Sequence, residues 1–267
     1  MFLKKSILIP LIFSFFVISI SSCSSDDSSD SDASSENGTD NTNGDLNAIC
    51  ADTQTTLFIE ENGVLDIEFE KTNFENTNWS FQQSIEGASG DGYLVWTGDT
   101  FFGNPGNGLL TYNIRIATPG TYKFIWRSYI TIGDQGSEHN DSWLRIPDAD
   151  HFYGMKNDGH IVYPKETTLD PIPESAGQTS TLPNGSGSDG WFKAYMNTQN
   201  TWKWNTKTSD NDAHNIYVVF DTPGDYTIEV SGRSTGHAID RFVLFTEDHL
   251  ESEITGDTAI NSHFICE

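Results

Sequence analysis

Apolar and polar residues alternate along most of the chain after about residue 50. Seven segments follow this period, and many of their apolar positions hold β-branched or aromatic residues: 56–59, 64–69, 110–116, 122–129, 216–220, 226–230 and 239–245. A period of two is typical of strands, because successive side chains point to opposite faces of the sheet. The pattern predicts an all-β domain over residues 50–267, a jelly-roll β-sandwich with long loops.

Two of these stretches, 111–126 and 215–230, echo one another. Each reads as a strand, a Pro-Gly turn and a second strand that opens on a tyrosine, which predicts two hairpins of one sandwich. The segment 146–214 differs from both, since it is rich in proline, glycine and polar residues. Long loops on a rigid scaffold often carry binding sites, so we expect a binding region there.

The N-terminus has the three parts of a signal peptide, which we assign to residues 1–22. Lys4 and Lys5 precede a short apolar stretch over 7–20, and small residues follow it. The tetrapeptide Ile20-Ser21-Ser22-Cys23 resembles the lipobox of bacterial lipoproteins. This resemblance implies that Cys23 carries the lipid anchor; the alternative is an ordinary signal peptide with an incidental cysteine.

Residues 23–49 form an acidic linker rich in serine and aspartate. Such a composition buries too little apolar surface to offset the entropy of the chain, so we expect a disordered tether. Acidic stretches directly after the lipidated cysteine resemble the surface-export signal of Bacteroidetes lipoproteins. The expected location is therefore the outer membrane, with the domain on the cell surface and the lipid as its sole membrane contact.

The charge of the chain narrows its partners. There are 14 Lys plus Arg against 39 Asp plus Glu, a formal net charge of −25. Such a surface repels phosphate backbones, which excludes nucleic acid as an expected partner. It also disfavours strongly anionic polysaccharides unless calcium or a local basic site intervenes.

Two cysteines, Cys50 and Cys266, stand near the two ends of the domain. In an oxidising compartment they predict a disulfide, and two free thiols are the alternative. The loop-entropy treatment gives such a closure about 5 kcal/mol of stabilisation.

Four segments, taken in order, resemble carbohydrate-binding modules of families 6 and 35. Residues 65–70 (LDIEFE) are similar to their opening strand, and 87–94 (GASGDGYL) to their glycine-rich turn. Residues 110–129 resemble their central hairpin, and 231–245 (SGRSTGHAIDRFVLF) their closing strand. The resemblance implies a jelly-roll β-sandwich that binds a polysaccharide or oligosaccharide.

The resemblance also implies a structural calcium site. Family members often bind calcium through two acids of the first strand and one aspartate of the last, which here are Glu68, Glu70 and Asp240. Residues 68 and 70 share one face of a strand, and backbone carbonyls would complete the six to eight oxygens that calcium takes. The alternative is that these are solvated surface acids.

Sugars are bound by flat aromatic rings and hydrogen-bonding side chains. The resemblance places one aromatic after the glycine-rich turn and a second in a later loop. The family's asparagine position holds Ala238, so His237 is a candidate substitute. The candidate sugar-binding residues are Tyr93, Trp96, Trp143, Trp191, Trp202, Trp204 and His237. We expect Trp126 in the core and an ion pair between Arg127 and Asp141.

Catalytic signatures are weak. The sequence lacks G-x-S-x-G, H-E-x-x-H and P-loop motifs. The candidate metal ligands are His151 and His160 with Asp148, Asp150 and Asp158, although loop residues of this kind are usually only solvated. The candidates for lyase chemistry are His160 and Tyr163. The leading hypothesis is a monomeric, non-catalytic surface lipoprotein that captures a polysaccharide within a glycan-utilisation system, beside outer-membrane uptake components. A polysaccharide-active lyase or hydrolase and a protein-binding adhesin are the alternatives.

Overall fold

A computed structural model describes residues 50–51, 53–175, 181–256 and 259–267. The predictions for the signal peptide, for Cys23 and for the linker up to residue 49 lie outside these residues. Among the described residues, no helix is both long enough and apolar enough to span a membrane.

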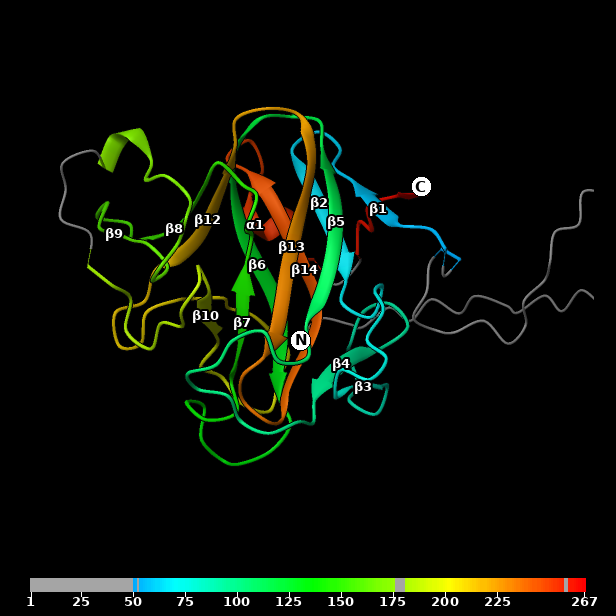
Figure 1. Cartoon of the computed structure of the whole chain (residues 1–267). Helices are drawn as coiled ribbons and strands as arrows, with labels where there is room; N and C mark the ends of the chain where they lie inside the picture. The colour runs from blue at the N-terminus through cyan, green and yellow to red at the C-terminus, as the bar shows by residue number, and fades with distance from the viewer. Residues whose placement is uncertain (1–49, 52, 176–180, 257–258) are drawn as a thin grey trace, which may run out of the picture. The chain divides into compact units, whose positions relative to one another are not determined.

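Strands dominate the structure and form two sheets, which confirms the predicted all-β sandwich (Figure 1). The first sheet has six strands in the order β10 (Phe192–Tyr195), β7 (Asp141–Arg145), β13 (Gly224–Gly232), β5 (Leu110–Ile116), β1 (Thr56–Ile59) and β15 (Phe264–Cys266). Strand β1 is parallel to β5 and antiparallel to β15.

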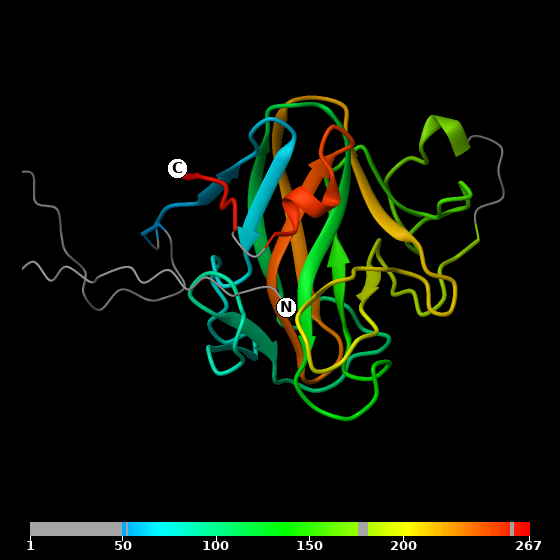
Figure 2. The same ribbon diagram turned by 180° about the vertical axis from the view of Figure 1, so that it is seen from behind.

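The second sheet is larger. Its main path runs through β3 (Trp79–Gln82), β4 (Tyr93–Trp96), β14 (His237–Thr246), β6 (Gly120–Ile130), β12 (Asn215–Phe220), β8 (His151–Met155) and β9 (Ile161–Val162). Two further strands join it: β2 (Val64–Glu68) pairs with β14, and β11 (Lys203–Trp204) pairs with β6. A 3-10 turn, η1 (Pro173–Ser175), and a short helix, α1 (Glu251–Ile254), complete the elements; α1 is visible from behind in Figure 2.

The main core lies between the two sheets and draws apolar side chains from both. Trp126 on β6 is fully buried in it, as predicted. Trp96 is also fully buried, and it fills the space beside Gly232, where an added Cβ would lie 2.2 Å from the ring. Burying each large apolar side chain contributes about 1.5–3 kcal/mol, and this core positions the loops at the end of the sandwich.

The prediction that 111–126 and 215–230 are two hairpins is wrong. Strands β5 and β13 lie in the first sheet, whereas β6 and β12 lie in the second. Each Pro-Gly turn therefore carries the chain from one sheet to the other. The first strand of each stretch pairs instead with the second strand of the other, β5 with β13 and β12 with β6.

The tyrosine that opens each second strand explains the echo. The Tyr122 hydroxyl donates to the Thr118 carbonyl at 2.6 Å, and the Tyr226 hydroxyl donates to the Thr222 carbonyl at 2.7 Å. Both bonds reach back four residues and close the turn on itself. The repeated sequence thus encodes two similar corners between sheets.

The segment 146–214 is not only loops. It contains β8, β9, β10 and β11, which extend both sheets at their edges. These strands are two to five residues long, too short for an alternating pattern to stand out among the surrounding glycine and proline residues.

The predicted disulfide between Cys50 and Cys266 is present. It ties the start of the domain to β15, beside the pairing of β1 with β15.

Candidate functional site

Two groups of residues stand out as candidate sites: a cluster of buried acids near β2 and β14, and a pocket at one end of the sandwich. The acids are Glu68, Glu70 and Asp240, which are 4%, 0% and 0% exposed. Asp240 lies where the pairing of β14 with β6 shifts register, a β-bulge that redirects a side chain.

The turn after β3 joins these acids together. The Ser89 hydroxyl lies 2.8 Å from Glu68 Oε2 and 3.0 Å from Asp240 Oδ2. The Ser89 backbone N–H donates to Asp240 Oδ1 at 3.0 Å, and the Asp91 N–H donates to Glu70 Oε1 at 3.3 Å. The prediction that the three acids are solvated surface groups is therefore excluded for these positions, because all are buried and share one turn.

Burial changes how these acids titrate. Burial raises the pKa of Glu68 to about 8, with further increases from the charges of Glu70 and Asp240. Burial likewise raises the pKa of Glu70 to about 7, and it raises the pKa of Asp240 despite the nearby Arg127 guanidinium. A group of like charges in a poorly solvated place holds protons or needs a cation.

The donor set fits a calcium ion. Glu68 Oε1 and Glu70 Oε2 are buried oxygens without a hydrogen-bond partner among the described residues. Gly90 keeps the cluster open, because a Cβ there would lie 2.9 Å from the Glu68 carboxyl carbon. Carboxylate oxygens are the ligands that calcium prefers.

The pocket has a volume of about 380 Å³. The β4–β5, β6–β7 and β13–β14 connections form it, together with β10. Its lining residues are Thr100, Phe102, Ser137, Glu138, His139, Asn140, Asp141, Lys193, Arg233 and Ser234.

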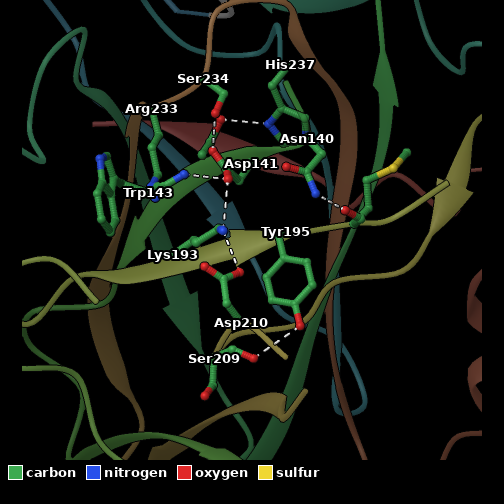
Figure 3. Close-up of polar contacts among 12 residues, drawn as sticks. Asn140, Asp141, Trp143, Lys193, Tyr195, Ser209, Asp210, Arg233, Ser234 and His237 are labelled. Atoms are coloured by element: carbon green, nitrogen blue, oxygen red, sulfur yellow. Dashed lines mark hydrogen bonds and ion pairs between the residues drawn. The ribbon is translucent and has the colours of Figure 1, made fainter. Parts of the chain in front are cut away.

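Asp141 organises the base of this pocket (Figure 3). Its carboxylate pairs with Arg233 at 2.5 Å and with Lys193 Nζ at 3.2 Å, and it accepts a hydrogen bond from the Ser234 hydroxyl. Lys193 also pairs with Asp210 at 2.5 Å. Burial by itself raises the pKa of Asp141, but the charges of Arg233 and Lys193 outweigh burial and lower that pKa.

Phe102 stands at the solvent-facing side of the pocket. Its side chain is 64% exposed, although it is a large apolar group. The Arg233 guanidinium lies 4.8 Å from the Phe102 ring centroid and 4.9 Å from that of Trp143. Arg233 therefore contacts a buried ring and an exposed ring, and the exposed ring is held in place at the pocket by cation–π attraction.

The structure corrects most of the sugar-binding residues expected from the sequence. A side chain must be exposed to stack on a sugar, and five candidates are at most 3% exposed: Tyr93, Trp96, Trp143, Trp191 and His237. They are packing residues. The reason is that a turn-rich sequence does not reveal which loop folds over which ring.

Several of these buried groups nevertheless support the pocket from beneath. Trp143 packs on Arg233, and its indole N–H donates to the Phe101 carbonyl at 3.0 Å. His237 Nδ1 lies 2.8 Å from the Ser142 hydroxyl. Trp191 packs instead under Arg145, whose guanidinium lies 4.7 Å from its ring centroid.

Trp202 and Trp204 are half-buried, and they remain candidates. Trp202 packs against Tyr93 and Tyr129, with the Arg127 guanidinium 5.5 Å from its ring centroid. Trp204 packs beside Arg241, whose guanidinium carbon lies 4.9 Å from the Trp204 ring centroid.

The expected ion pair between Arg127 and Asp141 is wrong. Arg127 donates to Asp240 at 2.8 Å, while Asp141 pairs with Arg233 and Lys193. Charge complementarity alone does not choose among partners that are distant in the sequence.

The histidines and acids of 148–160 do not form one metal site. Asp148 accepts the Thr227 N–H, and Asp150 accepts the Asp221 N–H, so both hold backbone turns. His151 Nδ1 lies 2.7 Å from the Asp170 carbonyl.

The two candidate lyase residues contact different partners and do not contact each other in these hydrogen bonds. The Tyr163 hydroxyl is bonded to Ser175 and Ile172, whereas His160 contacts His214.

Sequence reasoning missed the main residues of the pocket. Phe102, Lys193 and Arg233 stand in different connections and strands. Arg233 lies within the segment 231–245 that resembles the closing strand of the modules, which is a signal for it. The pair Phe101-Phe102 before a glycine and a proline marks an aromatic loop, which is the signal for Phe102.

Comparison with known proteins gives no match to a protein family or to a curated protein. Among solved structures, the chain is similar to a GH26-CBM35 β-(1,4)-mannanase from Podospora anserina, with 14% identity, a TM-score of 0.38 and coverage of 69% of this chain. It spans only 28% of that mannanase. It is also similar to the C-terminal CBM6 of a marine laminarinase from Zobellia galactanivorans, with 14% identity, a TM-score of 0.28, and coverage of 68% of this chain and 99% of that one.

Proposed function

We propose that the domain binds a glycan in the pocket at Phe102 and does so without catalysis. The observation that carries this proposal is the exposed Phe102 ring beside a base of buried polar and charged groups. The apolar face of a sugar packs on a flat ring, while its hydroxyls need hydrogen-bond donors and acceptors. Phe102 offers the ring, and the polar side chains of the pocket offer the donors and acceptors.

The charges of the pocket favour a neutral sugar. Lys193 and Arg233 are the cations of its lining, and both pair with Asp141 inside the fold. Glu138 adds a further acid. A carboxylated or sulfated sugar would gain little attraction from these cations, because Asp141 already pairs with both. The chain, with a net charge of −25, would also repel it.

Calcium is proposed as a structural ion of the same domain. Glu68, Glu70 and Asp240 would hold it, and the ion would neutralise three acids that are costly to bury as anions. The turn of Ser89 would then be fixed against β14.

The N-terminus supplies the proposed context. Cys23 would anchor the chain by lipid in the outer membrane, and the acidic linker would hold the domain at the cell surface. In this arrangement the domain, as a monomer, retains a polysaccharide near outer-membrane components of a glycan-utilisation system.

Affinity electrophoresis against a panel of neutral and acidic polysaccharides tests the proposal. We expect retarded migration on at least one neutral polysaccharide, and weaker retardation for Phe102→Ala. Absence of retardation on every glycan contradicts glycan binding. A parallel assay for released reducing ends and unsaturated products separates binding from catalysis, since sustained product release would establish an enzyme instead.

A further inference from the structure

We propose that His160, Asp212 and His214 form a binding site for a divalent transition metal of the zinc class. One ligand atom from each side chain lies within 4.8 Å of the others. His160 directly precedes β9, while Asp212 and His214 directly precede β12. The site is thus separate from both the acidic cluster and the Phe102 pocket, and it does not depend on glycan binding.

The two imidazoles face one another at a distance close to the one that a metal needs. His160 Nδ1 lies 2.9 Å from His214 Nε2. Two nitrogens on a tetrahedral zinc ion, each about 2.0–2.1 Å from the metal, stand about 3.3 Å apart. A separation wider by about 0.4 Å therefore admits the ion between them, which is within the reach of small side-chain rotations.

The tautomer of His214 presents a lone pair to this gap. His214 Nδ1 lies 2.5 Å from the Asp212 carbonyl oxygen, which accepts hydrogen bonds and cannot donate them. Nδ1 therefore carries the proton, and in the neutral ring Nε2 is the unprotonated nitrogen. Metal-binding histidines usually donate their second N–H to a carbonyl or carboxylate in this way. His214 is fully buried, and burial lowers its pKa, which favours the neutral ring.

His160 completes the pair with a change of tautomer. In the metal-free state its Nδ1 donates the proton that joins the two rings. When a metal binds, that proton moves to Nε2, which lies 3.4 Å from the Thr181 hydroxyl. The backbone of His160 is held by Asp158, whose carboxylate accepts the His160 N–H at 3.0 Å.

Asp212 supplies the oxygen ligand and already attracts a cation. Its Oδ1 accepts the Lys156 ammonium, while its Oδ2 lies 3.9 Å from His214 Nδ1. The Lys156 ammonium donates a hydrogen bond to this carboxylate and pairs with its charge. Lys156 is thus the native competitor of the metal for this carboxylate.

The donor set selects the class of metal. Two imidazole nitrogens and one carboxylate suit zinc and its neighbours, whereas calcium prefers oxygen ligands alone. Three protein ligands leave a fourth position for water. Residues that flank the ligands, including Asp158, Ala213 and Asn215, line an open hollow of about 420 Å³.

The binding of Zn²⁺ and Co²⁺ to the full chain tests the site, with a tag free of histidine and prior removal of metals by EDTA. Competition with a chromophoric chelator measures Zn²⁺ affinity, and the visible absorption of Co²⁺ reports a four-coordinate site. We expect His160→Gln and Asp212→Asn to weaken Zn²⁺ binding about tenfold or more, and to remove the intense Co²⁺ bands. Lys156→Met is expected to tighten Zn²⁺ binding several-fold, because it removes the competing ammonium.

His151→Gln is the matched control, since His151 lies on the neighbouring β8 and bonds to the Asp170 carbonyl. It is expected to bind Zn²⁺ like the unaltered chain. Circular dichroism and thermal melting in EDTA check that each variant is folded. His160 is half-buried, so His160→Gln tests the site and leaves the buried His214 in place. Equal Zn²⁺ affinity in the unaltered chain, His160→Gln and His151→Gln would overturn the proposal. Displacement of Co²⁺ by an equal concentration of Ca²⁺ would also overturn it.

Discussion

The Arg127 guanidinium donates a hydrogen bond to Asp240 at 2.8 Å, and both groups are largely or wholly buried. Asp240 occupies the bulge of β14, so its side chain turns toward Glu68 and the Ser89 turn. The Arg127 cation therefore pairs directly with Asp240, one of the three acids. The Lys71 charge also acts on Glu70, and the Arg241 charge acts on Glu68, yet the pKa values of both glutamates remain raised, which leaves the cluster in need of further positive charge.

Calcium is expected to stabilise the domain through this cluster. An ion at a hundredfold excess over its Kd adds about 2.7 kcal/mol, and about 2–4 °C per kcal/mol gives a Tm increase of about 5–10 °C for a domain of this size. Glu70→Gln should remove most of that increase. Differential scanning calorimetry in EDTA and in CaCl₂ measures it, with the exposed Glu75→Gln as control. Equal increases in both variants would show that the ion binds elsewhere.

Phe102→Ala is expected to weaken glycan binding about tenfold or more, because an aromatic ring that stacks on a sugar contributes a large share of the affinity. Its effect on stability should stay small, since the side chain is 64% exposed. Titration calorimetry with an oligosaccharide of the retained polysaccharide measures the affinity. Phe264→Ala changes another exposed aromatic, 40% exposed on β15, and should leave affinity unchanged.

Asp141→Ala is expected to destabilise the domain by about 3–5 kcal/mol. The change leaves Arg233 and Lys193 buried without their shared carboxylate, and unpaired buried charges carry a cost of this order. Asp210→Asn is the control, because Asp210 is partly exposed and bonds to Lys193 alone among these cations. Urea unfolding at pH 7 measures both. A loss below about 1 kcal/mol for Asp141→Ala would show that the pocket base is solvated.

His237 is expected to oppose folding as the pH drops below about 6.5, whereas the raised pKa values of Glu68 and Glu70 act in the opposite direction. Burial lowers the pKa of His237 from 6.5 to about 4. Between these values the unfolded chain binds a proton that the folded chain refuses, so acid favours unfolding. From pH 7 to pH 4.5 the unaltered chain should lose about 2–3 kcal/mol more than His237→Gln. Urea unfolding at both pH values gives the loss of unfolding free energy for each chain. An equal loss in the unaltered chain and in His237→Gln would exclude this role.

Replacing the Cys50–Cys266 disulfide by two serines is expected to lower the free energy of unfolding by about 2–5 kcal/mol. The bond closes a loop with a sequence separation of 216 residues, and its loss mainly increases the freedom of the unfolded chain. Urea unfolding of the double variant and of the unaltered chain, without reductant, measures the difference. Reductant should lower the stability of the unaltered chain alone.

The sequence by itself determined the strands, the sandwich and the disulfide. Alternation is a local property, and the seven alternating segments each contain a strand. Most of these strands bury one face, whereas β2 and β14 are buried on both faces. The motif of 65–70 and the closing strand also placed Glu68, Glu70 and Asp240 together, and the structure brings them to the Ser89 turn. The expectation that residues 68 and 70 share a face of one strand is wrong, because β2 ends at Glu68 and Glu70 lies in the turn that follows.

Only the tertiary structure decided which sheet each strand joins and which aromatic rings stay exposed. The Pro-Gly turns of 111–126 and 215–230 cross between sheets, although a hairpin would satisfy the same local pattern. Trp143 and the pair Phe101-Phe102 both follow polar or turn residues, yet Trp143 is fully buried and Phe102 is 64% exposed. The choice depends on contacts between segments far apart in the chain, such as Arg233 with Phe102 and Asp141. Local period and composition carry no information about those distant partners, whereas packing selects them.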